Sequence, residues 1–199
     1  NTFDRIGQNL KLTGRGACVP FLDYTSPGNN YECQPHVDRI LIAAAHMQDV
    51  KTVILVFRGR YIGAQTNYAD YEKFLEAMER TIELFVGTGK RLFVILPIVE
   101  PGFDPRLCAG TLPMGRPIPK NCIIDHANEQ AKTQMITNAW YQTKIKFPQI
   151  EIYDPNNAIC YNGSCPVIKN GHSMFKDDNH LSYSGSLLIG EQFRTLLEN

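Results

Sequence analysis

A short polar stretch near the C-terminus holds the residues best suited to chemistry. It runs from Phe175 to Ser182, and within it Asp177 and His180 are separated by two residues. On a tight turn, this spacing lets the carboxylate accept a hydrogen bond from one imidazole nitrogen, which leaves the other nitrogen facing outward. A histidine held in one tautomer is what a general base requires, since imidazole exchanges protons near neutral pH. The stretch therefore predicts His180 as a general base oriented by Asp177.

Helix capping is the alternative explanation for the same residues. A polar turn before a helix commonly contains Asp, Asn, Ser and His for capping alone, and by residue type this is the simpler explanation. Ser182 and Ser184 are both good N-cap candidates, and a cap there would hold the turn rigid. Residue types alone leave both explanations open.

Alternating helices and short apolar strands must position this turn. Strands are predicted at 51–57, 91–99 and 150–153, and helices at 2–12, 37–47, 69–86, 126–147 and 184–197. Strands that alternate with helices predict an α/β fold in which helices cover both faces of a parallel sheet, here as one domain over residues 1–199. Ligands of such sheets bind beyond the carboxyl ends of the strands, so we expect the site in segments 58–67, 97–125 and 154–183.

The composition excludes several classes of protein. The 199 residues carry 20 Lys+Arg and 20 Asp+Glu, so the formal net charge is zero, whereas nucleic-acid binders usually show a basic excess. No apolar run is long enough to cross a membrane. The chain starts at Asn1 with neither an initiator Met nor a signal peptide, so we expect it to be part of a longer protein.

Six cysteines indicate an oxidising compartment. They fall into three local couples, Cys18 with Cys33, Cys108 with Cys122, and Cys160 with Cys165. Sequence alone does not fix the connectivity, but pairing between neighbours is the simplest choice. Asn162-Gly163 between the last two cysteines favours a tight hairpin turn, which a bridge spans easily. Zinc is the alternative, but no CxxC occurs and the spacings fit no usual site, so we predict disulfides and no metal.

The polar stretch also resembles a known family block. Asp177-xx-His180-Leu181-Ser182, followed by Gly185, is similar to the last conserved block of the SGNH hydrolase superfamily. More narrowly, it resembles the extracytoplasmic SGNH domains fused to acyltransferase-3 membrane proteins. Further similarity lies in Tyr153-Asp154-Pro155, the Cys160–Cys165 hairpin and Gly16-Ala17-Cys18-Val19-Pro20, so that the resemblance covers most of the chain.

The resemblance implies a fold and a missing nucleophile. The fold would be flavodoxin-like, a three-layer α/β/α sandwich with a mainly parallel sheet of strand order 2-1-3-4-5. The superfamily's nucleophile is the serine of a Gly-Asp-Ser motif after the first strand, and these 199 residues contain no such motif. We therefore expect the first strand and the serine upstream of Asn1. Since the first strand lies inside the sheet in this order, its absence would leave inner strand edges unpaired.

Two residues are candidates for oxyanion stabilisation or substrate contact. In the superfamily a glycine amide and an asparagine side chain assist the amide of the nucleophile. Gly16, or Gly14, could supply the glycine amide, but no Gly-x-Asn follows the strand at 51–57. Arg58 stands at that point and resembles an arginine of the acyltransferase-linked domains. A solvated arginine at a strand end is an equally good explanation.

The resemblance implies transfer of an acyl group, most simply acetylation of a cell-envelope glycan such as O-antigen. The chain would need no cofactor, because an acyltransferase-3 transmembrane domain of the same polypeptide would supply the acyl group. The domain would lie in the periplasm, or otherwise outside the cytoplasm, tethered to the inner membrane, with a surface glycan rather than nucleic acid as its partner. The alternatives are a secreted carbohydrate or lipid acetylesterase, and a glycan-binding domain without activity.

Overall fold

The computed structural model describes residues 7, 9–26, 32–59, 68–108 and 122–198. Its order of elements is α2 (Gln34–His46), β1 (Thr52–Val56), α3 (Tyr68–Gly87), β2 (Arg91–Ile95), the 3-10 helix η2 (Pro105–Leu107), β3 (Ile123–Asp125), α4 (His126–Lys146), β4 (Glu151–Tyr153), α5 (Asn156–Ile159), β5 (Ser164–Pro166), β6 (Ile168–Lys169), β7 (His172–Ser173) and α6 (Tyr183–Leu197). The chain divides into two compact units, and α4 begins in one and continues into the other. One unit takes in residues 11–97 and 132–154, called here the sheet unit. The other takes in residues 1–10, 98–131 and 155–199, called here the turn unit.

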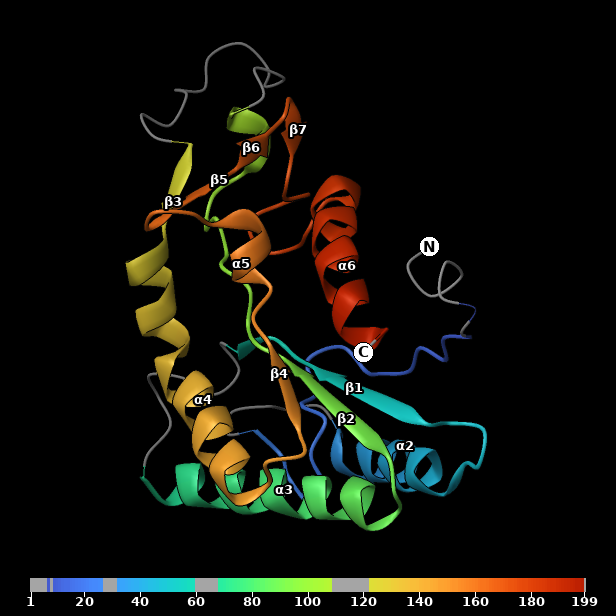
Figure 1. The fold of residues 1–199 in the computed structure, drawn as a ribbon. Coiled ribbons are helices and arrows are strands. Elements are labelled where there is room, and N and C mark those ends of the chain that lie inside the picture. The colour runs from blue at the N-terminus through green and yellow to red at the C-terminus, as the bar shows by residue number, and fades with distance from the viewer. Residues whose placement is uncertain (1–6, 8, 27–31, 60–67, 109–121, 199) are drawn as a thin grey trace. The chain divides into compact units, whose positions relative to one another are not determined.

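The sheet unit contains the predicted parallel sheet. Its strands lie in the order β1-β2-β4, and all pair in parallel (Figure 1). Parallel neighbours need a long crossover connection, which α3 supplies between β1 and β2. The strand predicted at 91–99 ends at Ile95, two residues before Pro97, since proline cannot donate a ladder hydrogen bond. The mixed α/β class with a parallel sheet is thus confirmed.

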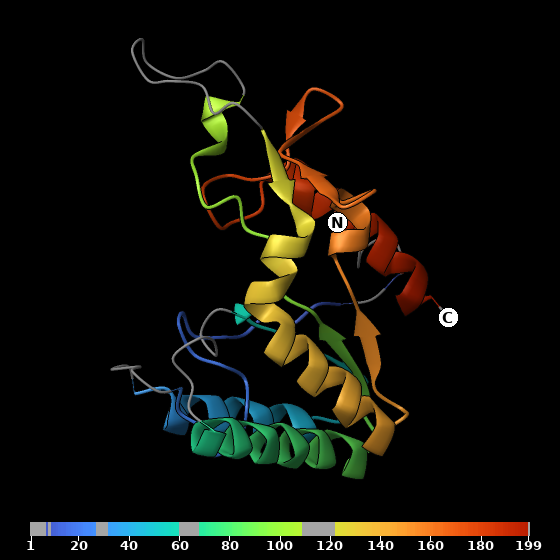
Figure 2. The ribbon, with the colours of Figure 1, turned by 90° about the vertical axis from the view of Figure 1, so that its left-hand side faces the viewer.

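One face of the sheet carries the core of this unit. Figures 1 and 2 both show α2 and α3 side by side on that face. Alternate strand residues point toward them, and the cluster includes Leu55, Leu92, Val94 and the fully buried Trp140 of α4. The strand residues between them point away from α2 and α3, and one of these, Val56, is 60% exposed. Within the described residues of this unit, the helices therefore bury one face and leave part of the other in solvent.

Pairing in the sheet agrees with the expected strand order. In the order 2-1-3-4-5, a missing first strand leaves the neighbouring third strand with an unpaired edge. In the structure, β1 pairs with β2 over Thr52–Val56 and Arg91–Ile95, without a gap. Consecutive pairing of this kind is what strands three, four and five of that order would show. Among the described strands, the sheet edges lie at β1 and β4, so a further strand could join only there.

The predicted helix at 2–12 is wrong over its last residues. Residues 9–12 are not helical, and Leu12 is 89% exposed, while residues 1–6 and 8 lie outside the described residues. A short helix is marginal in water unless its apolar side packs against something. Because Leu10 and Leu12 pack against no core here, the apolar spacing has no packing to stabilise it.

The turn unit is built from short strands and the helices α5 and α6, together with η2 and the start of α4. Strands β3 and β5 pair antiparallel, as do β6 and β7. Their core gathers the buried residues Val99, Ile124, Ile159, Val167 and Phe175, with Leu181 and Leu188 packed against it. These short strands were not predicted from the sequence, because strands of two or three residues are too short to show a period.

Candidate active site

The polar stretch forms a closed turn between β7 and α6. The backbone N–H of Lys176 donates to the carbonyl of His180 at 2.8 Å, and Phe175 and Leu181 form an antiparallel bridge. The carboxylate of Asp177 caps the turn from inside, because its Oδ1 accepts the backbone N–H of Asn179 at 3.0 Å and that of His180 at 2.7 Å. An aspartate that bonds backbone groups two and three residues ahead is a common way to fix a tight turn. The local sequence thus determines this conformation.

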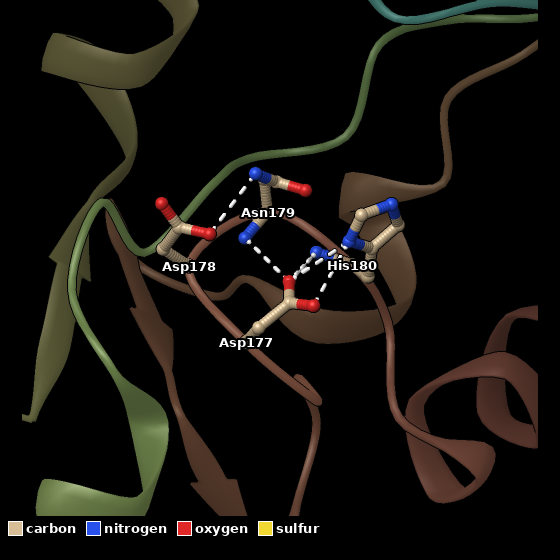
Figure 3. A network of polar contacts seen from close by, with 4 residues as sticks. All are labelled: Asp177, Asp178, Asn179 and His180. Carbon is tan, nitrogen blue, oxygen red and sulfur yellow. Dashed lines mark hydrogen bonds and ion pairs between the residues drawn. The ribbon is translucent and has the colours of Figure 1, made fainter. Parts of the chain in front are cut away.

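The structure brings the two predicted catalytic side chains together. Nδ1 of His180 lies 2.9 Å from Oδ1 and 3.0 Å from Oδ2 of Asp177 (Figure 3). A carboxylate can only accept, so this contact requires the proton on Nδ1 and leaves Nε2 as the acceptor. Figure 3 shows the other ring nitrogen pointing away from Asp177. The His180 side chain is 72% exposed, so that nitrogen is within reach of a molecule from solution.

The charge of Asp177 is stabilised by its surroundings. The backbone N–H of Asn179 is the largest of the effects that hold the pKa of Asp177 below its ordinary value. The backbone N–H and the imidazole of His180 act in the same direction and outweigh desolvation, which raises the pKa. Hydrogen bonds to the charged form of a carboxyl group favour ionisation. Asp177 is therefore a carboxylate at neutral pH, as an orienting group for histidine must be.

The start of α6 holds the turn from its C-terminal side. Ser182 is the N-cap, and its Oγ accepts the backbone N–H of Gly185 at 3.0 Å and donates to the carbonyl of Ser173. Its backbone N–H donates to the carbonyl of Met174 at 2.9 Å. A side chain at Gly185 would have no room, because a Cβ there would lie 2.1 Å from that same carbonyl oxygen. Capping by Ser182 and positioning of His180 are thus compatible, not competing, explanations of this stretch.

Gly102 is an anchor of the turn that sequence analysis missed. Its backbone N–H donates to the carbonyl of Asp178 at 3.0 Å, and it has a φ of 70°, a conformation that favours glycine. The loop that carries Gly102 is itself fixed, because the N–H of Val99 donates to Oδ1 of Asn156 at 2.8 Å. The contact joins residues 76 positions apart (178 − 102), and no local pattern marks such a pair. A Pro-Gly pair such as Pro101-Gly102 indicates a turn but not the partner of that turn.

The other predicted site residues lie in the sheet unit. Gly16 is exposed, within a turn closed by a hydrogen bond from the N–H of Cys18 to the carbonyl of Arg15. Arg58 is exposed and follows the end of β1, as predicted. The next residue, Gly59, is buried, and a Cβ there would lie 2.5 Å from Cγ of Pro97. The backbone beside Arg58 is therefore tightly packed, while the roles predicted for Gly16 and Arg58 stay predictions.

Three disulfides connect the couples that sequence analysis favoured. The bonds are Cys18–Cys33, Cys108–Cys122 and Cys160–Cys165. In the last hairpin, Asn162 and Gly163 have φ values of 48° and 76°, as a type I′ turn requires. The neighbour pairing is therefore confirmed. Disulfides of this number are typical of proteins outside the reducing cytosol.

One group of side chains in the described part of the chain has the types and spacing of metal ligands. It consists of His126, Cys160 and Cys165, whose ligand atoms lie within 4.8 Å of one another. The two sulfurs are bonded to each other, and a disulfide sulfur is not the thiolate that binds metals. In the same part of the chain, no helix combines the length and apolar character that crossing a membrane demands.

Comparisons with known proteins agree with the sequence resemblance. A family model described as "SGNH domain (fused to AT3 domains)" matches residues 1–195. Among solved structures, the chain is similar to the periplasmic domain of a lipopolysaccharide acetyltransferase from Salmonella ser. Paratyphi A. That match has a TM-score of 0.63 and 14% identity, and it covers 100% of this chain and 76% of the other. No curated protein matches the chain significantly. The structural likeness supports the fold, and the family match covers nearly the whole chain.

Proposed function

This chain belongs to the family of SGNH domains fused to AT3 domains, and we propose that it transfers acyl groups through a serine-dependent mechanism. The acceptor of the proposal is a hydroxyl group of a cell-envelope glycan, such as the O-antigen of lipopolysaccharide. Support comes from the family match, and from the solved relative, which is a lipopolysaccharide acetyltransferase domain. The observation that carries the proposal is the hydrogen-bonded pair of Asp177 and His180 on a capped turn.

In the proposed first step, His180 activates the nucleophile. Nε2 accepts the proton of a serine hydroxyl, and the serine oxygen attacks the carbonyl carbon of the acyl donor. Since the chain lacks the Gly-Asp-Ser motif, the proposal takes this serine from outside these 199 residues. The bond between the acyl carbon and the donor breaks, and the leaving group takes the proton from His180. Asp177 keeps the imidazole in the required tautomer and stabilises the imidazolium.

The second step passes the acyl group on. A glycan hydroxyl gives its proton to Nε2 of His180 and attacks the acyl-serine, which forms the new ester. The bond between the acyl carbon and the serine oxygen breaks, and the serine oxygen takes the proton from Nε2. Each step places negative charge on the former carbonyl oxygen, which needs donors aimed at it. For such donors the sequence resemblance offers the backbone N–H of Gly16 and the guanidinium of Arg58, whose roles stay predictions.

The proposed setting is the periplasm or another extracytoplasmic space. Three disulfides agree with an oxidising compartment, and the solved relative is a periplasmic domain. An AT3 transmembrane domain in the same polypeptide would tether the domain to the inner membrane and bring the acyl group across it. No cofactor enters this scheme, because every step is a proton transfer or an acyl transfer.

Exposure of the histidine supports a second candidate reaction. With its side chain 72% exposed, His180 could activate water instead of a sugar hydroxyl, which would make the protein an acetylesterase. The two candidates use the same proton acceptor and differ only in the acceptor of the acyl group. Acetylated glycan as the product supports the transferase, and free acetate alone supports the esterase.

Replacement of the proposed base tests the function. The full-length protein is incubated with acyl donor and glycan, and the acetyl ester is measured by mass spectrometry. We expect His180→Ala to lower the rate by about 10²–10⁴-fold, the usual contribution of a general base. His172→Ala is the matched control, because His172 is an exposed histidine of the same unit outside the turn. Full activity in His180→Ala would refute the proposal.

A further inference from the structure

An exposed aromatic residue follows the proposed base by three positions in the chain. Tyr183 is the first residue of α6, three positions after His180, and it is 79% exposed. It is absent from the buried cluster of the turn unit, to which Leu181 and Leu188 contribute. Single exposed aromatic residues are common on proteins, so exposure alone carries no argument. Tyr183 differs from such residues in its position in the chain and in the rigidity of the backbone that carries it.

The backbone between the base and the ring is fixed on both sides. The carbonyl of His180 accepts the N–H of Lys176, and the N–H of Ser182 donates to the carbonyl of Met174. Three residues span at most about 10 Å, so the Cα atoms of His180 and Tyr183 lie no farther apart than that. The Cα atom of Tyr183 therefore belongs to a backbone that is fixed within about 10 Å of the Cα atom of His180. A fixed backbone lowers the conformational cost of a contact between Tyr183 and a molecule bound at His180.

From these observations we infer that Tyr183 is a specificity residue on which a sugar ring of the acceptor glycan stacks. This inference rests on the proposed function. A pyranose ring has apolar C–H faces and hydroxyl groups around its rim. An aromatic ring can pack against a C–H face while the hydroxyl groups stay in contact with water. A hydroxyl must come within hydrogen-bond reach of Nε2 for proton transfer, so the sugar ring has to be held beside His180. Tyrosine offers a large contact area at a low cost in conformational entropy.

The same face of α6 offers a second contact. Leu187 follows Tyr183 by four residues, so the two side chains are neighbours on the helix surface, and Leu187 is 41% exposed. Together they make a small exposed apolar surface on the first two turns of α6, the helix that directly follows the turn with His180. A face of this size suits one or two sugar rings, since a protein partner would need far more area. The proposed occupant is therefore the acceptor glycan.

Kinetics of the full-length protein separate this role from a structural one. We expect Tyr183→Ala to raise the KM for the glycan acceptor about tenfold, which is the loss of about 1.4 kcal/mol of binding. The release of acetate in the absence of glycan should not change, because that reaction needs only donor, serine and His180. Tyr183→Trp should keep the KM for the glycan acceptor near the wild-type value, because tryptophan also offers an aromatic face. Alanine favours helices, so the Ala variant keeps α6 intact. Tyr161→Ala is the matched control, because Tyr161 is another exposed tyrosine of the same unit.

The outcomes distinguish this inference from the proposed function. If His180→Ala abolishes both reactions while Tyr183→Ala leaves the acceptor KM unchanged, the stacking role is refuted and the proposed function stands. Equal loss of both reactions in Tyr183→Ala would assign the residue to the structure of the turn or to docking of the donor domain, and would overturn the inference. Full activity of His180→Ala would refute the proposed function itself.

Discussion

Replacement of Gly185 by alanine should damage the turn that holds His180. A Cβ at this position would lie 2.1 Å from the carbonyl oxygen of Met174, which is backbone and cannot rotate away. That carbonyl also accepts the N–H of Ser182, so moving it weakens the hydrogen bond that joins the start of α6 to the preceding strand. The substitution therefore acts on the same backbone that positions the proposed base.

The size of the effect follows from three contributions. Overpacking costs about 1–3 kcal/mol, and weakening one hydrogen bond costs about 1 kcal/mol. Alanine in a helix recovers about 1 kcal/mol relative to glycine. The net loss of unfolding free energy is about 1–3 kcal/mol, and for a protein of this length the melting temperature should fall by about 3–10 °C.

Thermal unfolding followed by circular dichroism measures this change. Gly87→Ala is the matched control, because Gly87 is also helical and a Cβ there meets no atom within 4 Å. We expect this control to keep or raise the melting temperature, since only the propensity gain applies. Gly185→Ala should also lose acyl transfer. If the two variants were equally stable and Gly185→Ala fully active, the packing argument for this turn would be wrong.

Four further predictions concern the turn and one disulfide. Asp177→Asn keeps the shape of the side chain but no longer fixes the histidine tautomer, so kcat should fall by about 10²–10⁴-fold while the glycan KM stays near the wild-type value. The N–H of Asn179 and the other hydrogen bonds lower the pKa of Asp177 in the folded state. Its contribution to stability should therefore be present above the unfolded carboxyl pKa of about 4, and it should be lost as pH falls through the folded pKa. The free energies of unfolding of wild type and Asp177→Asn should accordingly converge in acid, as unfolding measured over a range of pH would show. Ser182→Ala should lower the free energy of unfolding by about 0.5–2 kcal/mol, which denaturant titration measures, and no change would contradict the capping role. Removal of the Cys18–Cys33 bond, which spans 15 positions, should cost about 3 kcal/mol by the same titration.

Long elements were predictable because their apolar residues repeat. The helix predicted at 69–86 is α3 at Tyr68–Gly87, and the strand predicted at 51–57 is β1 at Thr52–Val56. The helix predicted at 2–12 had a similar spacing but no packing for Leu10 and Leu12. Periodicity reports which residues could face a core, whereas the presence of that core depends on distant parts of the chain.

The candidate site was predictable to the extent that its contacts are local. Every hydrogen bond between Asp177 and His180 spans three residues, so the sequence could indicate it directly. Gly102 bonds to Asp178 across 76 positions, and no short motif carries that information. Local contacts determine the pair, and distant contacts determine where the turn is held.

This division explains why a turn with an exposed histidine can be precise. His180 is 72% exposed, and burial therefore cannot fix its orientation. Its position comes instead from backbone hydrogen bonds on both sides of the turn, from the carboxylate of Asp177 inside it, and from the anchor at Gly102. An exposed histidine on such a scaffold keeps its orientation without a buried pocket around it. That orientation is what the proposed proton transfer at Nε2 requires.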